Sequence, residues 1–255
     1  MKKLTPLLPL LLLPALALTA RPTPPAGANA PASALSTAAY PPAERQPRPV
    51  APFTAVSAEG SMRVVLRQGS PQRVEVDASV ADQVKVETRV DGGSLRVGRR
   101  REGSGLFGTE RFEGPVTVYV TAPSLTALSV AGSGDLRVEG PVQAGDFRIS
   151  VAGSGNLDLP QLTAQNLKTS VAGSGNATLG GSCAQHQLSI QGSGGVNATN
   201  LRTDDTRVSI SSSGNARVNA AKTLAASIAG SGDVLYSGSP QVSSSKAGSG
   251  SVKRM

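Results

Sequence analysis

Polar and apolar residues alternate along the C-terminal half of the chain, and this alternation is itself repeated. Seven segments begin at a serine that mostly lies between apolar residues, and each leads into Gly-Ser-Gly or a close variant. The serines are Ser129, Ser150, Ser170, Ser189, Ser209, Ser227 and Ser245, which recur every 18 to 21 residues. A period of two predicts strands whose apolar residues face one way and whose serines face the other. The longer period predicts a solenoid in which each coil stacks on its neighbours.

The second residue of each repeat predicts an interior row of β-branched side chains. This row comprises Val130, Val151, Val171, Ile190, Ile210 and Ile228. The Gly-Ser-Gly that follows predicts a tight corner, because glycine adopts positive φ easily. A second short strand follows the corner, and a less regular third segment places Cys183 on one inward row with Val142, Leu162 and Leu201. Three short sides of about 20 residues in total predict an all-β parallel β-helix.

The chain divides into four predicted regions. Residues 1–20 combine a short basic start with an apolar stretch and small residues, which is typical of a secretory signal peptide. Residues 21–52 are rich in Pro and Ala, so we expect a disordered tether with order beginning near Phe53. Residues 53–123 are rich in strands but irregular, as expected for the start and cap of a solenoid, and residues 124–255 carry the regular repeats.

Charge and composition narrow the possible partners. The formal net charge is +8, and Arg99-Arg100-Arg101 is the densest basic run, which makes it a candidate anion-binding loop. The chain has no Trp and only 3% aromatic residues, so platforms for stacking bases are scarce. We therefore expect no nucleic-acid partner. We also expect no transmembrane anchor in the mature chain, because beyond the leader no segment has the roughly 20 apolar residues that a membrane span needs.

The residues that carry chemistry in other proteins form no convincing site here. Cys183 and His186 are the only cysteine and histidine, and Cys183 is predicted to face the core, where a free thiol behaves as a small apolar group. Calcium-binding β-roll repeats use a nine-residue period with an aspartate in each turn, whereas only Asp135 and Asp233 are acidic at these corners. The sequence thus predicts no catalytic residues, no cofactor and no metal site.

Three features together resemble a known family. A strand opens at Phe53, the segment Pro123–Val130 reads Pro-Ser-Leu-Thr-Ala-Leu-Ser-Val, and Gly-Ser-Gly-Asp/Asn is then reiterated. Residues 53–255 are in this respect similar to the auto-transporter adhesin family called the head GIN domain, exported bacterial proteins that are common in Bacteroidetes. The resemblance implies a right-handed β-helix and an adhesin-like function.

The sequence therefore predicts an exported, non-enzymatic binding or structural module at the cell envelope of a Gram-negative bacterium, either in the periplasm or on the outer surface. The candidate docking face is the row of small outward residues at Ser129, Ser150, Ser170, Ser189, Ser209 and Ser227. Its expected partner is an envelope or cell-surface protein, a glycan, or a second copy of the chain. Two alternatives stay open: a β-helical carbohydrate-active enzyme (a polysaccharide lyase or hydrolase), and a periplasmic scaffold without an external ligand.

Overall fold

The structure is a computed structural model that describes residues 44–100 and 111–255, all within one compact unit, Tyr40–Met255. The predicted signal peptide and residues 21–43 of the predicted tether lie outside the described residues. Within them the fold is nearly all β, and the helix α1 (Val80–Gln83) is a single turn. The strands are β1 (Glu44–Pro47), β2 (Ala55–Gly60), β3 (Arg63–Gln68), β4 (Arg73–Ala78), β5 (Val86–Asp91), β6 (Ser94–Arg99), β7 (Thr117–Ala122), β8 (Ala127–Gly132), β9 (Asp135–Val138), β10 (Val142–Gly153), β11 (Asn156–Gly173), β12 (Asn176–Gly192), β13 (Gly195–Ser212), β14 (Asn215–Gly230), β15 (Asp233–Ser237), β16 (Gln241–Ala247) and β17 (Ser251–Arg254).

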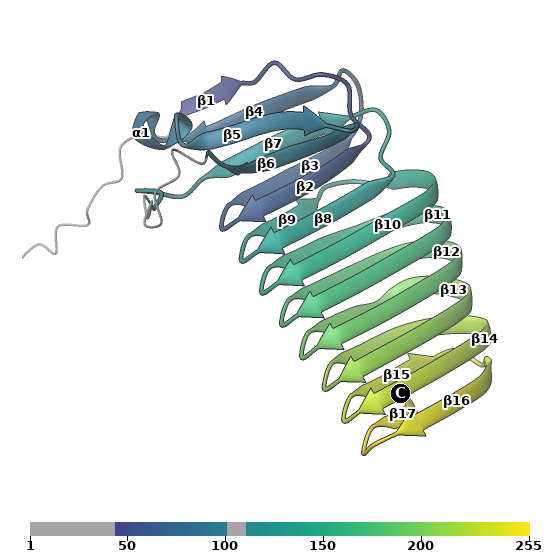
Figure 1. Ribbon diagram of the computed structural model, residues 1–255. Coiled ribbons are helices and arrows are strands. Elements are labelled where there is room, and N and C mark those ends of the chain that lie inside the picture. The colour runs from purple at the N-terminus through teal and green to yellow at the C-terminus, as the bar shows by residue number, and fades with distance from the viewer. Residues whose placement is uncertain (1–43, 101–110) are drawn as a thin grey trace, which may run out of the picture. The chain divides into compact units, whose positions relative to one another are not determined.

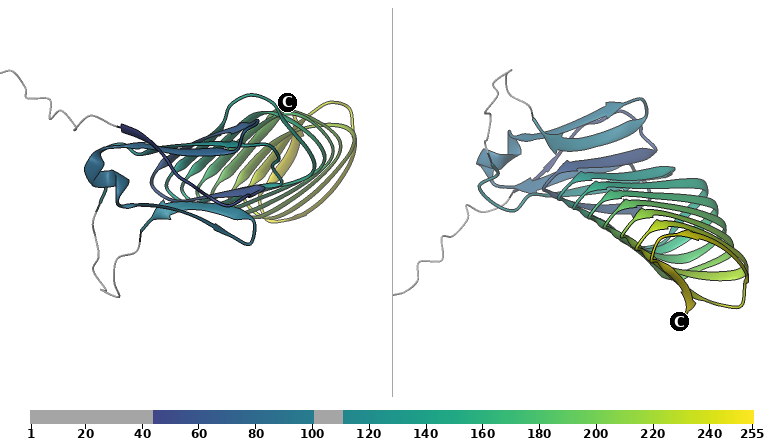
Figure 2. Two further views of the ribbon diagram at one scale, coloured as in Figure 1. Left: turned by 90° about the horizontal axis from the view of Figure 1, so that it is seen from above. Right: turned by 60° about the horizontal axis from the view of Figure 1, so that its bottom comes forward.

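Strands β8 to β17 wind into a parallel β-helix, in which each coil pairs with the coils before and after it (Figure 1). The long strands β11 to β14 follow the chain around most of a coil, from one corner to the next (Figure 2). Paired residues are one repeat apart in sequence, as Val151 is from Val171. Each coil thereby satisfies the backbone hydrogen bonds of its neighbours. The predicted fold class, a parallel β-helix with about 20 residues per coil, is confirmed.

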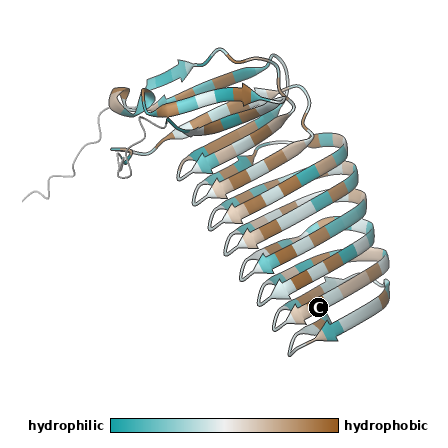
Figure 3. Ribbon diagram, in the orientation of Figure 1, coloured by the Kyte–Doolittle hydropathy of each residue, from teal (hydrophilic) through white to brown (hydrophobic). Residues whose placement is uncertain are grey.

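The predicted interior row is confirmed. Its six members pair one above another from β8 to β14, and each side chain is at most 2% exposed. Along each strand, apolar residues alternate with polar ones, as the hydropathy colouring shows (Figure 3). The apolar side of each strand faces the inside of the coil, and its polar side faces solvent. The core is therefore a set of stacked rows, in which each side chain packs against its counterparts in the coils above and below.

Most corners use both glycines of Gly-Ser-Gly. The first, such as Gly153, has a φ of 110°, a conformation that is costly for residues with a side chain. The second, such as Gly175, lies so close to the coil before it that an added Cβ would overlap Gly155 O and lie 2.7 Å from Val151 Cγ1. The second glycine is present in all seven copies because the coils stack backbone against backbone. At the first position Ser212 replaces glycine once, with a φ of 110°.

We expect Gly175→Ala to lower the free energy of unfolding by about 2 kcal/mol, because the backbone carbonyl of Gly155 cannot move without displacing the next coil. The matched control is Gly145→Ala: a Cβ at Gly145 would meet nothing within 4 Å. Urea denaturation of both variants measures the difference. Equal stability of the two variants would contradict this account of the corner.

The N-terminal region begins as a coil and then departs from the repeat. Strands β2 and β3 pair in parallel with β8 and β9, in the same register as the later coils. Beyond them the chain adds antiparallel pairs, in which β4 lies between β1 and β7, and β5 pairs with β6. Because antiparallel strands continue the sheet in a different geometry, this region ends the run of parallel coils.

The predicted start of order near Phe53 is wrong, because residues 44–47 already belong to the fold. Residues 44–47, which we assigned to the disordered tether, form β1 and pair with β4. The buried side chain of Gln83 donates a hydrogen bond of 2.6 Å to Glu44 O, and Arg48 donates one of 2.7 Å to Gln83 O. Proline is tolerated in an edge strand such as β1, so a Pro-rich composition did not exclude strand pairing here.

The predicted partners of Cys183 are also wrong, although the residue is buried at 6% exposure. It pairs with Ala164 and Thr203, and the position in register with Leu162 and Leu201 belongs to Gly181. The cause is a register shift after β11 residue Leu159, where β12 has one residue fewer than β11. An alignment by approximate distance from the preceding serine therefore selected the wrong residue.

Candidate binding face

The predicted docking serines lie in one continuous row on the outside of the coils. Pairing aligns all six in consecutive strands, and each is half-buried or exposed. Ser245 extends the row at one end, and Ser57, which the repeat alignment did not include, extends it at the other. We call the outer surface formed by this row and by the four residues before each serine in these strands the strand-one face.

A second row runs beside the serines, two residues earlier in each strand. Its members are Arg148, Lys168, Gln187, Arg207 and Ala225, and all five are exposed. We call it the cation row. Sequence reasoning missed these residues, although the signal was present at a constant spacing of two before each serine. Only alignment of the coils in space shows that three cations follow one another along the face.

A third row lies two residues before the cation row and completes a groove. It contains Asp146, Asn166, Gln185, Asp205 and Thr223. Asn166 donates a hydrogen bond of 2.7 Å to Asp146, and Thr223 donates one of 2.6 Å to Asp205. The cation row and this third row together line a solvent-open groove along the coils. The strand-one face thus presents cations, carboxylates, amides and hydroxyls side by side.

The structure describes two of the three residues of the predicted anion-binding loop. Arg99 is the last residue of β6, Arg100 donates its backbone N–H to Lys85 O at 2.8 Å, and Arg101 lies outside the described residues. A separate pocket brings Arg99 together with Arg111 and Glu59. Arg99 lies in β6, which pairs with β2, the strand that carries Ser57 at the end of the serine row. Their role in anion binding stays a prediction.

Cys183 and His186 do not form a nucleophile and base in this structure. Burial raises the pKa of the Cys183 thiol to about 12, with a smaller contribution from the charge of Asp204, so the reactive thiolate is suppressed. His186 is buried, and its Nε2 lies 3.0 Å from Thr169 Oγ1. Burial lowers the pKa of His186 to about 4, so the ring is neutral at pH 7. Both side chains belong to a polar seam inside the coils.

We expect Cys183 to resist a bulky maleimide in the folded protein at pH 7, because its sulfur is buried and protonated. Unfolding in urea should restore rapid labelling, which is measured by mass spectrometry. Replacing exposed Ser182 by Cys in a Cys183→Ala background gives a matched control that should label rapidly while folded. Comparable rates for the wild type and this control would show that the thiol is accessible.

The Asp and Asn residues after the corners form a hydrogen-bonded ladder between coils. Asn156 donates to Asp135 at 3.0 Å, and Asn176 donates to Asn156 at 3.3 Å. Near the C-terminal end Ser251 donates both its backbone N–H and its hydroxyl to Asp233. In the part of the chain that the structure describes, no three His, Cys, Asp or Glu side chains gather as a metal site. The ladder connects corners on either side of Gly195, which has no side chain to continue it.

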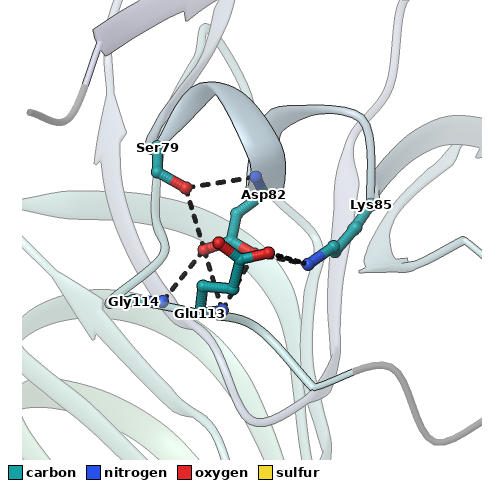
Figure 4. Close-up of polar contacts among 5 residues, drawn as sticks. All are labelled: Ser79, Asp82, Lys85, Glu113 and Gly114. Atoms are coloured by element: carbon teal, nitrogen blue, oxygen red, sulfur yellow. Dashed lines mark hydrogen bonds and ion pairs between the residues drawn. The ribbon is translucent and has the colours of Figure 1, made fainter. Parts of the chain in front are cut away.

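A buried carboxylate in the N-terminal region also has a structural role (Figure 4). Asp82 is fully buried and accepts hydrogen bonds from the backbone N–H groups of Glu113 and Gly114 and from Ser79 Oγ, while Lys85 Nζ lies 3.3 Å away. Burial raises the pKa of Asp82, but these hydrogen bonds outweigh it and hold the pKa below its ordinary value. Through these hydrogen bonds Asp82 holds the backbone at Glu113 and Gly114 against the turn at α1.

These observations define the class of protein as a parallel β-helix with an outer groove. Within the described residues, no helix is both long and apolar enough to cross a membrane. The family described as "Putative auto-transporter adhesin, head GIN domain" matches residues 52–240, and the chain belongs to this family. The resemblance predicted from the sequence is confirmed. No curated protein matches the chain.

Solved structures of low sequence identity share the fold. A crystal structure described as a putative adhesin from Bacteroides fragilis matches with a TM-score of 0.74 and 22% identity, covering 84% of this chain and 97% of that one. One described as a putative lipid binding protein from Parabacteroides distasonis matches at 0.71 and 23%, covering 84% and 97%. Another from P. distasonis, described as a putative adhesin, matches at 0.72 and 20%, covering 84% and 98%. At these identities the likeness establishes the fold alone.

Proposed function

We propose that this chain is an exported, non-enzymatic, adhesin-like module of a Gram-negative cell envelope and that it binds its partner through the strand-one face. One observation carries the proposal. Outward side chains of successive coils form straight rows, so the serine row offers the same hydroxyl group at intervals of about 4.8 Å along the β-helix. A partner with its own linear repeat would meet matching groups at every coil.

Membership of a family described as adhesins and the adhesin descriptions of two of the solved relatives support this proposal. The serine row adds a flat surface whose short side chains lose little entropy when a partner covers them. The cation row beside it adds charge, and the groove gives a linear partner a place to lie. The proposal includes the location of the protein, in the periplasm or on the outer surface. It also includes the predicted signal peptide and the tether that follows it.

The test introduces two large, uncharged side chains on the strand-one face. We expect Ser189→Tyr combined with Ser209→Tyr to reduce binding of the labelled full chain to envelope fractions of the source organism by about tenfold, because two stacked rings would stand above a flat contact surface. The matched control is Thr178→Tyr with Asn197→Tyr, an exposed pair that is aligned on neighbouring coils in the strands after the corner. Tyrosine has a high strand propensity, so circular dichroism should be unchanged for both pairs.

Two outcomes would contradict the proposal. Undiminished binding by the Ser189 and Ser209 pair would exclude the strand-one face. Release of reducing ends or unsaturated sugars from envelope polysaccharides, with or without calcium, would show an enzyme instead of a binding module.

A further inference from the structure

We infer that the cation row and the groove beside it bind a linear acidic polysaccharide that carries carboxylate groups, laid along the β-helix across successive coils. This inference rests on the proposed function and names the partner of the same face.

The first argument is the unbalanced charge of the cation row. Arg148 and Lys168 are directly paired neighbours in β10 and β11, and like charges in such positions destabilise a sheet. Neither they nor Arg207 form an ion pair with any residue that the structure describes. Elsewhere on the outer surface a pair such as Arg137 and Asp158 does form across neighbouring coils. The cation row therefore holds three exposed positive charges that an anionic ligand would neutralise.

The second argument is the mixture of groups around the cations. Asp146 and Asp205 border the cation row on one side, and the serine row borders it on the other. A polyphosphate or duplex DNA has no hydroxyl groups along its chain to donate to the two carboxylates, and the face carries no aromatic side chain on which bases could stack. An acidic sugar chain fits both features, because its carboxylates pair with the cations while its hydroxyls donate to Asp146 and Asp205 and exchange hydrogen bonds with the serines.

The third argument is spacing. Coils repeat about every 4.8 Å, which is close to the length of one sugar residue in an extended polysaccharide. Arg148, Lys168 and Arg207 lie on the first, second and fourth of four successive coils, with Gln187 on the third. A chain of about four sugars would span them, with its carboxylates opposite the three cations.

The experiment uses the full chain and polygalacturonate immobilised for biolayer interferometry. Fully methyl-esterified polygalacturonate is the matched ligand, because it keeps the backbone and removes the charge. We expect the acid to bind at least about tenfold more tightly than the ester at low salt, and its affinity to fall as salt rises, since exposed charge pairs are screened.

The variant Arg148→Gln, Lys168→Gln, Arg207→Gln should weaken binding of the acid by about tenfold or more, because it removes three charge contacts. Glutamine occupies the same row naturally at Gln187, so the substitution suits the strand. The matched control is Arg202→Gln, Arg217→Gln, Lys253→Gln, which removes the same charge from exposed positions outside the strand-one face. This control should change the affinity by less than about twofold.

Four results would overturn the inference: no binding of polygalacturonate, equal binding of the ester, an equal loss in both triple variants, or tighter binding of polyphosphate or duplex DNA. Failure here is distinguishable from failure of the proposed function. If the glutamine triple keeps full binding to envelope fractions while the Ser189 and Ser209 tyrosine pair loses it, the face is the binding surface and the acidic polysaccharide is not its partner.

Discussion

Val171→Asp should leave almost no soluble folded protein. Val171 is fully buried in the interior row between Val151 and Ile190, and those neighbours are themselves fully buried. A carboxylate there would have no partner, and burial of such a group costs several kcal/mol, comparable to the whole stability of many domains. Expression yield, circular dichroism and size-exclusion chromatography measure the loss.

The control for this variant is Ala172→Asp, the same side chain one residue later in the same strand. Because side chains alternate, position 172 faces solvent, and Ala172 is exposed. We expect Ala172→Asp to express and melt nearly as the wild type does, with a change within about 1 kcal/mol. A folded Val171→Asp protein with normal melting would mean that the interior row is assigned to the wrong face.

The same alternation explains which parts of the fold could be predicted from the sequence. Val171 was placed correctly because the repeat around it is nearly invariant, and a period of two leaves only two possible faces. The prediction gave Cys183 the wrong partners because β12 has one residue fewer than β11 just after Leu179. Counting residues from Ser170 does not show where along the strand this difference lies. Strand β1 was missed because composition predicts average burial, whereas β1 depends on long-range contacts with β4 and Gln83.

The candidate site could be predicted only in part, for a related reason. The serines are conspicuous because they recur in every copy of the repeat. The cation row has a charged residue in only three coils, at Arg148, Lys168 and Arg207, and it becomes a surface only when pairing sets those coils side by side. The residues that repeat in the sequence are therefore those that the stacking of coils requires. The cation row lies at outward positions, where stacking permits a different residue in each coil.

The polar seam inside the coils predicts a pH-dependent stability that an entirely apolar core would lack. His186 pairs in the sheet with Leu167 on one side and Thr206 on the other, and it is 2% exposed. Its Nδ1 is buried without a hydrogen-bond partner among the described residues, and Nε2 contacts Thr169. The ring is therefore held neutral in an interior that does not solvate a positive charge.

We expect the free energy of unfolding to fall by about 3 kcal/mol between pH 6.5 and pH 4, because burial lowers the pKa of His186 from 6.5 to about 4. In this window the unfolded chain binds a proton at His186 and the folded chain does not, so stability is lost as the pH falls below the unfolded pKa. Below about pH 4 both states bind the proton and this contribution becomes constant. Urea denaturation at intervals of half a pH unit measures the slope.

The variant Thr169→Val with His186→Leu isolates this contribution. It removes both partners of the buried hydrogen bond, so no orphaned polar group remains, and it places leucine beside Leu167 in the same row. His186 is the only histidine in the chain, and the hydrogen-bonded carboxylates Asp82 and Asp233 have pKa values below 3.8, so their stabilisation is lost at lower pH. We therefore expect a nearly flat stability between pH 6.5 and pH 4.5 in the double variant. A slope equal to that of the wild type would show that groups other than His186 carry the pH dependence.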